Sequence, residues 1–228
     1  MRKVALIAGT PVDTKMGLEF IEKKNLEAGE RIFDPIYLPA EEGCDEQALF
    51  QRGSEDRKRK RVDELFDIAR SDGACDFFIY CNSLAGAFDF ESYAAEKTAE
   101  AENEIKVYTP HQVYRDLGRS YSCLGVVAAH NMSASAIEIA LMEGNPDICV
   151  IGSGNLQIVR MIEEGIEAEK IVRSCGLKSM AEYMKASGAE AILLGCTHFP
   201  YLTEALKGLT DLPIIDPAEE MYRNLLNG

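Results

Sequence analysis

The sequence predicts an α/β protein with mostly parallel sheets flanked by helices, arranged as two similar lobes. Short apolar runs of strand length alternate with segments of helical periodicity along the whole chain, which is the pattern of successive β–α–β units. One further pattern, an apolar strand followed by a cysteine and two polar residues, occurs once in each half. With 228 residues, of which 46% are hydrophobic and 27% charged, the chain has the composition of a folded globular protein.

The expected strands are short apolar runs bounded by polar or glycine-containing segments. In chain order they are Lys3–Ala8, Ile32–Leu38, Cys75–Tyr80, Ile105–Tyr108, Cys123–Ala128, Ile148–Ile151, Ala191–Leu194 and Pro213–Ile215. Most of the segments between them carry apolar residues three and four positions apart, which predicts amphipathic helices. These helices are Leu18–Leu26, Val62–Ala69, Ser133–Met142, Leu156–Ile162, Leu177–Met184 and Tyr201–Leu206.

Three segments need an interpretation of their own. Ala40–Gly53 is the least periodic and is expected to be a surface excursion. Residues 57–61 are all basic but have acidic pairs on both sides, which favours a solvated helix face with i,i+4 charge pairs over a nucleic-acid or targeting patch. Gly152-Ser153-Gly154 lacks the third glycine and the acidic residue of a dinucleotide-binding turn, so we interpret it as a simple strand-to-helix turn.

The chain is expected to divide into a first lobe of residues 1–109 plus 212–228 and a second lobe of residues 110–211. The turn signal Thr109-Pro110 marks the crossing between them. One cysteine, Cys81, follows an expected strand of the first lobe, and Cys196 follows an expected strand of the second. Ligands of parallel sheets bind beyond the carboxyl ends of the strands, so two facing lobes would place these thiols on opposite sides of a cleft.

Charge and composition exclude several classes of protein. A formal net charge of −14 argues against a general affinity for nucleic acid or anionic lipid. No stretch reaches the roughly 18 consecutive apolar residues of a membrane span, and the N-terminus enters a strand rather than a signal peptide. We therefore expect a cytoplasmic protein.

The seven cysteines show no regular spacing and no Cys-x-x-Cys pair. This pattern fits a reducing compartment and predicts neither a disulfide framework nor a zinc site. The cysteines outside the repeated pattern are interpreted as small buried hydrophobic residues. They are Cys44, Cys75, Cys123, Cys149 and Cys175.

Two thiols on opposite sides of a carbon atom can invert its configuration. One sulfur removes the α-proton as thiolate while the other returns a proton from the opposite face. Cysteine suits both roles because its ordinary pKa of about 8.5 is close to neutrality. The carbanion formed in between needs hydrogen-bond donors around the neighbouring carboxylate; Asn82, Ser83 and Thr197, with the backbone N–H groups of the following helices, are donors of that kind.

The residues around both cysteines resemble the two cysteine motifs of the glutamate racemases. The second motif is matched by Leu194-Gly195-Cys196-Thr197-His198-Phe199-Pro200, and the first by Cys81-Asn82-Ser83-Leu84-Ala85, where Thr usually follows Asn in the family. The similarity keeps its order and spacing across most of the chain. The sequence therefore resembles a member of the aspartate/glutamate racemase superfamily, with motifs most similar to those of glutamate racemase.

This resemblance implies two pseudo-symmetric flavodoxin-like lobes with the active site in the cleft between them, no metal or organic cofactor, and a homodimer. Its implied substrate is a small acidic amino acid, glutamate first and aspartate second. Cys81 would deprotonate the D-enantiomer and Cys196 the L-enantiomer. Asn82, Ser83 and Thr197 would hold the head group of the substrate, and His198 would tune or reprotonate Cys196.

Two loops depart from the family pattern. The Asp-Ser-Gly that usually follows the first strand is replaced by Gly9-Thr10-Pro11-Val12-Asp13, in which Thr10 can replace the serine and Asp13 the aspartate. The Gly/Ala-Thr-x-Gly-Thr loop of the second lobe is replaced by residues 128–133, where His130, Asn131 and Ser133 are the candidate substitutes. All of these residues are also plausible helix caps or turn formers.

These departures leave other functions open. The side-chain pocket could accept aspartate or another substrate, and the superfamily also contains isomerases and decarboxylases. Both thiols are retained, which argues against a decarboxylase because that reaction needs only one proton donor. A protein that binds an acidic ligand without turnover is the alternative from a different functional class.

Overall fold

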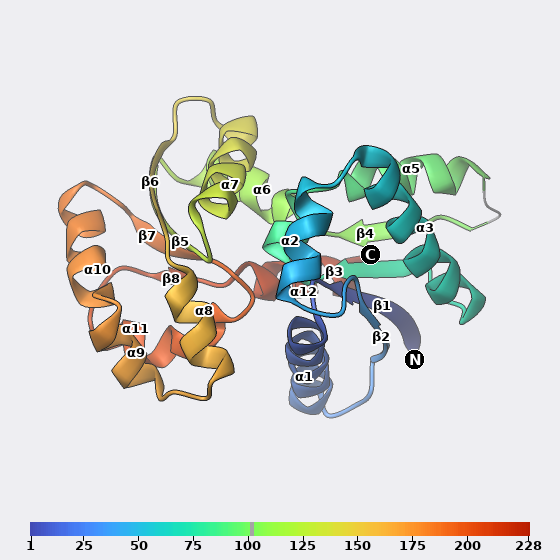
Figure 1. Cartoon of the computed structure of the whole chain (residues 1–228), viewed down its shortest axis with the longest axis horizontal. Coiled ribbons are helices and arrows are strands. Elements are labelled where there is room, and N and C mark those ends of the chain that lie inside the picture. The colour runs from blue at the N-terminus through green and yellow to red at the C-terminus, as the bar shows by residue number, and fades with distance from the viewer. Residues whose placement is uncertain (101–102) are drawn as a thin grey trace. The chain divides into compact units, whose positions relative to one another are not determined.

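The computed structural model describes residues 1–100 and 103–228, which form two compact units (Figure 1). The first unit comprises Met1–Pro110 and Met221–Gly228, and the second comprises His111–Glu220. Each unit contains a four-stranded sheet in which all strand pairs are parallel. The strand orders, β2-β1-β3-β4 and β6-β5-β7-β8, describe the same topology twice. The predicted α/β fold with two topologically equivalent lobes is confirmed.

Every predicted strand is present. The strands are β1 (Arg2–Ala8), β2 (Phe33–Pro39), β3 (Asp76–Ile79), β4 (Lys106–Tyr108), β5 (Cys123–Ala128), β6 (Cys149–Gly154), β7 (Ala191–Gly195) and β8 (Ile214–Ile215). The helices are α1 (Pro11–Ala28), α2 (Cys44–Arg52), α3 (Glu55–Ser71), α4 (Asn82–Ala85), α5 (Phe90–Glu100), α6 (Pro110–Ser120), α7 (Asn131–Gly144), α8 (Leu156–Glu163), α9 (Ala168–Ser174), α10 (Leu177–Ala186), α11 (Thr203–Lys207) and α12 (Pro217–Asn227), with a 3-10 turn η1 (Phe199–Leu202) before α11.

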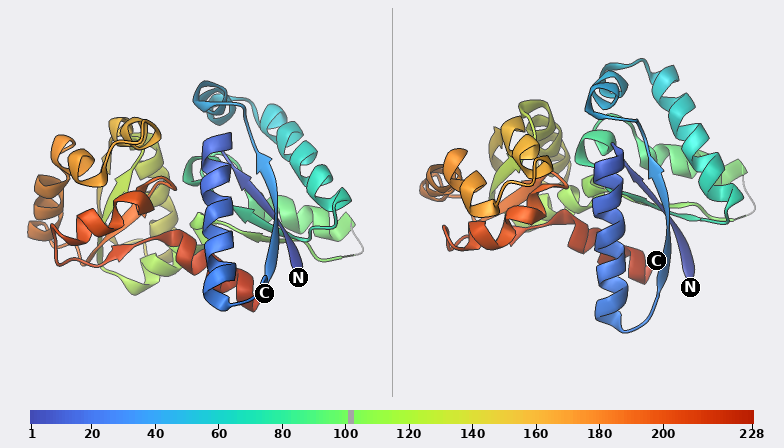
Figure 2. Two further views of the ribbon diagram at one scale, coloured as in Figure 1. Left: turned by 90° about the horizontal axis from the view of Figure 1, so that it is seen from below. Right: turned by 60° about the horizontal axis from the view of Figure 1, so that its bottom comes forward.

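Helix α1 shows how the chain brings a helix close to the first sheet. Thr10 caps its first turn by accepting a hydrogen bond from the Asp13 N–H, and the helix ends at Gly29, whose φ of 74° suits glycine. The helix lies along β1 and β2 (Figure 2). At Gly17 a Cβ atom would stand 2.9 Å from both Leu6 and Tyr80, so the absence of a side chain there permits this close approach.

The second sheet is covered on both faces. Leu124, Val126 and Ala128 of β5 pack into one hydrophobic cluster with residues of α6 and α7. The intervening Gly125 points to the opposite face, where a Cβ atom would meet the Met184 sulfur of α10 at 2.7 Å. This alternation is expected for a strand with period two that is buried on both sides.

Several segments differ from the sequence-based expectations. The expected excursion at 40–53 contains helix α2, whose single apolar stripe is too short to give a clear period. Gly152-Ser153-Gly154 is not a turn but the end of β6, in register with residues 126–128 of β5. The helix face at 57–61 is not fully solvated, since Lys58 is buried and its ion pair with Glu55 has i,i+3 spacing.

The two ends of the second unit also differ in detail from the expected boundaries. The Thr109-Pro110 signal is the start of α6, with proline in the first turn of the helix. The sequence places residues 212–228 in the first lobe, whereas in the structure β8 pairs with β7 in the second sheet. Of this C-terminal segment, only residues 221–228 belong to the first unit. There Tyr222 packs edge-on against Phe20 and Phe33.

Candidate functional site

Cys81 lies at the carboxyl end of the first sheet. It follows β3 by two residues, precedes α4, and is 3% exposed. The backbone N–H groups of Gly9, Ser83 and Leu84 donate toward its sulfur atom, as expected where a strand edge meets the first turn of a helix. The side-chain amide of Gln47 adds a fourth donor, with its Nε2 3.3 Å from the Cys81 Sγ.

The Cys81 thiol is held mainly in its protonated form. Burial, and after it the nearby Asp13 carboxylate, raise its pKa to about 12, although the backbone donors act in the opposite direction. At neutral pH the group is therefore a thiol. Formation of a thiolate at this position requires a base that accepts the proton, and the Asp13 carboxylate lies close enough to act as that base.

The loop after β1 also contributes to the surroundings of the Cys81 thiol. Thr10 and Asp13 are both buried, whereas Pro11 lies half-buried at the start of α1. Thr10 is engaged in capping, since its Oγ1 accepts from the Asp13 N–H at 3.3 Å and its carbonyl accepts from the Thr14 hydroxyl at 2.7 Å. Of the predicted residues of this loop, Asp13 presents its charge to the Cys81 thiol, whereas Thr10 and Pro11 form the start of α1.

Cys196 lies directly after β7, at the position in the second sheet that corresponds to Cys81 in the first. Its sulfur atom is 3.7 Å from His198 Nδ1, and the other ring nitrogen of His198 is 3.2 Å from Oε1 of Glu163. Glu163 is the last residue of α8. The geometry can pass a proton from the thiol to the imidazole while the carboxylate orients the ring and stabilises its charged form.

The residues after β5 are engaged in local hydrogen bonds. His130 caps α7, because its Nδ1 accepts from the Ser133 N–H at 3.2 Å. The Asn131 side chain accepts from the Gly154 N–H at 3.1 Å and so joins the ends of β5 and β6. His130, Asn131 and Ser133 thus shape the loop beside β7, because Ala128 at the end of β5 is in register with Gly195.

The remaining predicted residues immediately follow the two cysteines. Asn82 is buried, whereas Ser83 and Thr197 are half-buried. All three make polar interactions within the protein. Within each unit, the structure thus brings the predicted residues together at the carboxyl edge of the sheet.

Two residues of these environments were missed by the sequence analysis. Gln47 lies on α2, 34 positions before Cys81, and Glu163 lies 35 positions before His198. Both contacts join segments that are far apart in the sequence, so no local sequence motif predicts them. The sequence offered one indication for Glu163, namely a carboxylate at the end of a predicted helix. It offered no indication for Gln47, because the segment around this residue shows no clear hydrophobic period.

Two broader features of the structure bear on function. Among residues 1–100 and 103–228, no group of three or more His, Cys, Asp and Glu side chains is arranged to hold a metal ion. In the same part of the chain, no helix combines the length and apolar character needed to cross a membrane.

The structure is similar to solved racemases over nearly its whole length. Glutamate racemase from Francisella tularensis subsp. tularensis SCHU S4, solved in complex with D-glutamate, matches with a TM-score of 0.69 and 22% identity, covering 99% of this chain and 80% of that protein. An aspartate racemase homologue from Pyrococcus horikoshii OT3 matches with a TM-score of 0.63 and 17% identity, covering 100% of this chain and 98% of that protein. At sequence identities of 22% and 17%, this structural similarity establishes the fold alone.

Sequence comparison gives the family. Glutamate racemase from Limosilactobacillus reuteri (strain DSM 20016) is 32% identical over 110 residues, which are 45% of this chain and 39% of that racemase. The match thus spans about two fifths of the length of this curated relative. The profile of the Asp/Glu/Hydantoin racemase family matches residues 48–224, most of the chain. The chain belongs to the Asp/Glu/Hydantoin racemase family.

Proposed function

We propose that this protein is a cofactor-independent amino-acid racemase that interconverts the L- and D-forms of an acidic amino acid, with glutamate as the first candidate substrate. One observation carries the proposal: in a chain of this family, a cysteine follows the equivalent strand of each sheet, and each has its own acid–base partner. A reaction that takes a proton from one face and returns it to the other requires such a pair.

In the proposed mechanism each sulfur alternates between thiol and thiolate. Cys196 removes the α-proton of the L-enantiomer after passing its own proton to His198, whose charged ring is stabilised by Glu163. Cys81 delivers a proton to the opposite face, consistent with the burial that keeps it protonated. The reverse direction begins when Asp13 accepts the Cys81 proton, so that Cys81 deprotonates the D-enantiomer. The mechanism uses no metal and no organic cofactor.

Backbone and side-chain donors would stabilise the carbanion. Without an electron-withdrawing cofactor, the negative charge can spread only onto the substrate carboxylate, which needs preorganised donors in a water-poor site. We assign this role to the N–H groups at the starts of the helices after each cysteine, to Asn82 and Ser83, and to Thr197. His130, Asn131 and Ser133 are proposed to contact the substrate from the loop after β5, and Thr10, Pro11 and Asp13 from the loop after β1.

Aspartate is the second candidate substrate. The loops after β1 and β5 depart from the glutamate racemase pattern at positions proposed to contact the substrate, and one solved structure with the same fold is an aspartate racemase homologue. A shorter side chain would leave the two-thiol chemistry unchanged. We propose further that the protein acts in the cytoplasm as a homodimer and binds neither nucleic acid nor membrane, in keeping with its net charge of −14.

Isotope exchange tests the proposed reaction. The purified protein is incubated in deuterated water with L-glutamate or L-aspartate, while circular dichroism records loss of optical activity and mass spectrometry records deuterium at the α-carbon. A racemase converts one of these substrates to the racemic mixture with solvent deuterium in the product. A protein that exchanges no α-hydrogen in any acidic amino acid would refute the proposal in favour of ligand binding without turnover.

Substitution of each thiol tests the two-base assignment. Cys81→Ala and Cys196→Ala should each abolish racemisation, because either change removes one of the two proton carriers. Cys175→Ala, which removes a half-buried thiol bonded only loosely to Met161 at 3.8 Å, is the matched control and should retain activity. Full activity in either site variant would contradict the two-base scheme.

A further inference from the structure

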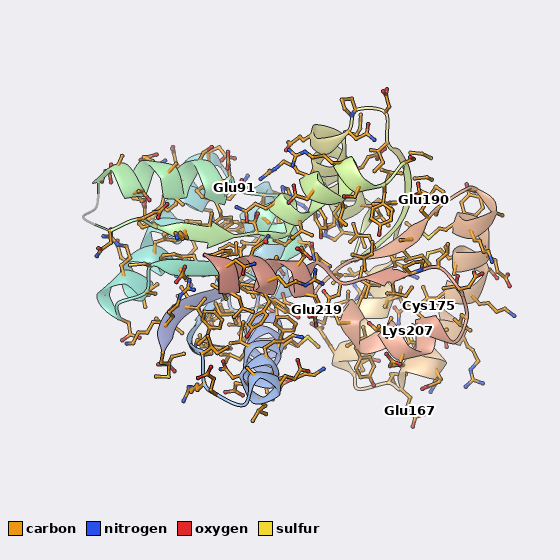
Figure 3. The ribbon with its side chains drawn as sticks, turned by 180° about the vertical axis from the view of Figure 1, so that it is seen from behind. Glu91, Glu167, Cys175, Glu190, Lys207 and Glu219 are labelled. Atoms are coloured by element: carbon orange, nitrogen blue, oxygen red, sulfur yellow. The ribbon has the colours of Figure 1, made fainter. Side chains whose placement is uncertain are left out.

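A second pair of cysteines lies outside the proposed site. Cys123 and Cys149 are the first residues of β5 and β6 and are direct partners in the register of this parallel pair. Cys196 follows the carboxyl end of β7, whereas these two residues lie at the amino ends of their strands. Glu190, labelled in Figure 3, marks this amino end, since its carboxylate accepts from the Ser122 and Cys123 N–H groups at 2.8 and 3.0 Å.

The side chains of Cys123 and Cys149 point in the same direction. In-register residues of neighbouring parallel strands project to the same face of a sheet, with Cα atoms about 4.8 Å apart, which is inside the range of about 4.4–6.8 Å that a disulfide spans. The two thiols are within hydrogen-bonding reach of each other. The expectation that both cysteines are buried hydrophobic residues is wrong for Cys149, which is exposed.

The two thiols differ in solvent exposure and in their position in the sheet, and this gives them different roles. Strand β6 is the edge of its sheet, so an external reagent can reach Cys149 without opening the fold. Cys123 is buried at 8% exposure. Burial, together with the hydrogen bond to Cys149, raises the pKa of Cys123 to about 11, so Cys123 stays protonated at neutral pH. Cys149 is exposed and is therefore the thiol that a reagent meets first.

We propose that Cys123 and Cys149 form a reversible redox site, in which a low-molecular-weight disulfide such as oxidised glutathione converts the thiol pair to an intramolecular disulfide. The Cys149 thiolate attacks one sulfur of the reagent, a bond forms between Cys149 and glutathione, and one glutathione thiolate leaves. Cys123 then loses its proton and attacks the Cys149 sulfur, which releases the second glutathione. Two protein thiols are oxidised, one glutathione disulfide is reduced, and the two thiol protons end on the two glutathione molecules.

This bond would be a labile one. Exposed or strained disulfides have more oxidising potentials than buried structural ones, and a bridge between directly paired strands must form within the fixed spacing of the ladder. The pair therefore stays reduced under strongly reducing conditions and closes when the ratio of glutathione disulfide to glutathione rises. Closure ties the edge strand β6 to β5.

Thiol trapping tests the proposal on the full chain. The protein is equilibrated in glutathione buffers of increasing oxidised fraction, quenched with acid, alkylated under denaturing conditions, and mapped by peptide mass spectrometry. We expect a cross-linked peptide pair containing Cys123 and Cys149 that increases with the oxidised fraction and disappears with dithiothreitol. Cys149→Ser should abolish this cross-link, whereas Cys175→Ser, at the separate position labelled in Figure 3, should keep it.

Two results would overturn the inference. A stable mixed disulfide of Cys149 with glutathione, with Cys123 still alkylated, would show that the buried thiol cannot complete the exchange. Full alkylation of both residues in a buffer that oxidises dithiothreitol would show that the pair does not respond at all. Neither result depends on racemase activity, so this inference and the proposed function fail independently.

Discussion

At the scale of single residues, the two proposed thiols lie in chemically different surroundings. Cys81 is surrounded by N–H donors and one carboxylate, and its pKa is raised. Cys196 has an imidazole within 3.7 Å, which is in turn paired with a carboxylate. The same residue type is therefore biased toward thiol in one unit and provided with a proton acceptor in the other, which is the asymmetry that a two-base reaction needs before each turnover.

Glu163 is proposed to act through His198 as a positioning residue. Glu163→Gln keeps the shape of the side chain but removes the charge that stabilises a protonated imidazole, so kcat should fall by about 10²-fold with little change in KM. Steady-state kinetics in both directions measure this effect. Glu164→Gln changes the neighbouring glutamate at the end of the same helix and should have wild-type kcat; equal losses in both variants would contradict the role.

Gln47 is proposed to stabilise the thiolate form of Cys81. Gln47→Ala removes the amide donor 3.3 Å from the sulfur atom, and loss of a hydrogen bond to a charged group should shift the acidic limb of the kcat/KM profile upward by about one pH unit. The measurement is the pH dependence of conversion of the D- to the L-enantiomer, the direction in which Cys81 acts as the base. Gln51→Ala, one turn further along α2, is the control and should leave the profile in place; an unshifted profile in Gln47→Ala would remove Gln47 from the site.

At the scale of elements, the strand ends and helix caps position the candidate residues. Each cysteine stands between a parallel strand and the following helical turn, and the Ser83 and Leu84 N–H groups of that turn donate toward the Cys81 sulfur. The loop after β5 is held by His130 at the cap of α7 and by Asn131 across to Gly154. These contacts orient the loop independently of any substrate.

The cap of α7 can be tested separately from catalysis. His130→Ala removes the acceptor for the Ser133 N–H and should lower the free energy of unfolding by about 1 kcal/mol, whereas His130→Asn provides a good capping residue and should lower it less. Urea unfolding measures both. Identical unfolding of wild type and His130→Ala would show that the side chain is not needed as a cap.

At the scale of the whole molecule, the chain folds the same four-stranded topology twice and then returns to complete the first unit. The last helix, α12, provides Tyr222, whose ring contacts Phe20 and Phe33 at centroid distances of 6.0 and 5.8 Å. Arg2 also donates to the Leu225 carbonyl at 3.1 Å. The first unit thus depends on residues from both ends of the sequence.

Removal of the Tyr222 ring should destabilise the first unit. Tyr222→Ala leaves a cavity beside two aromatic rings and should cost about 3 kcal/mol or more in the free energy of unfolding. Leu226→Ala on the same helix removes a side chain that is 42% exposed and should cost much less. Chemical denaturation checks the difference; similar losses in both variants would contradict the anchoring role of Tyr222.

Stability at alkaline pH should report the Cys81 environment. The pKa of Cys81 rises from 9.0 to about 12 on folding, so the folded state keeps a proton that the unfolded chain releases. Its contribution is fully present below pH 9 and is lost as pH rises toward 12, at up to about 1.4 kcal/mol per pH unit.

The comparison of Cys81→Ser with wild type isolates this contribution. Wild type should lose stability more steeply than Cys81→Ser between pH 9 and 11 in denaturant titrations. Cys75→Ser, which removes a half-buried thiol outside the site, should lose stability as steeply as wild type. If the free energy of unfolding of Cys81→Ser fell with pH as steeply as that of the wild type, the raised pKa of Cys81 would be contradicted.

Local pattern was sufficient for the strands, for the three longest helices α1, α3 and α7, and for the positions of both proposed cysteines after their strands, because apolar periodicity and strand-to-cysteine spacing are properties of consecutive residues. It gave no helix at α5, α6 or α12, and it failed at α2 and at the end of β6, where helix length or sheet pairing overrides a short, ambiguous pattern. The partners Gln47 and Glu163, and the pairing of Cys123 with Cys149, depend on contacts between segments far apart in the chain. Such contacts arise only when parallel strands align and helices pack on them, so no reading of neighbouring residues could have supplied them.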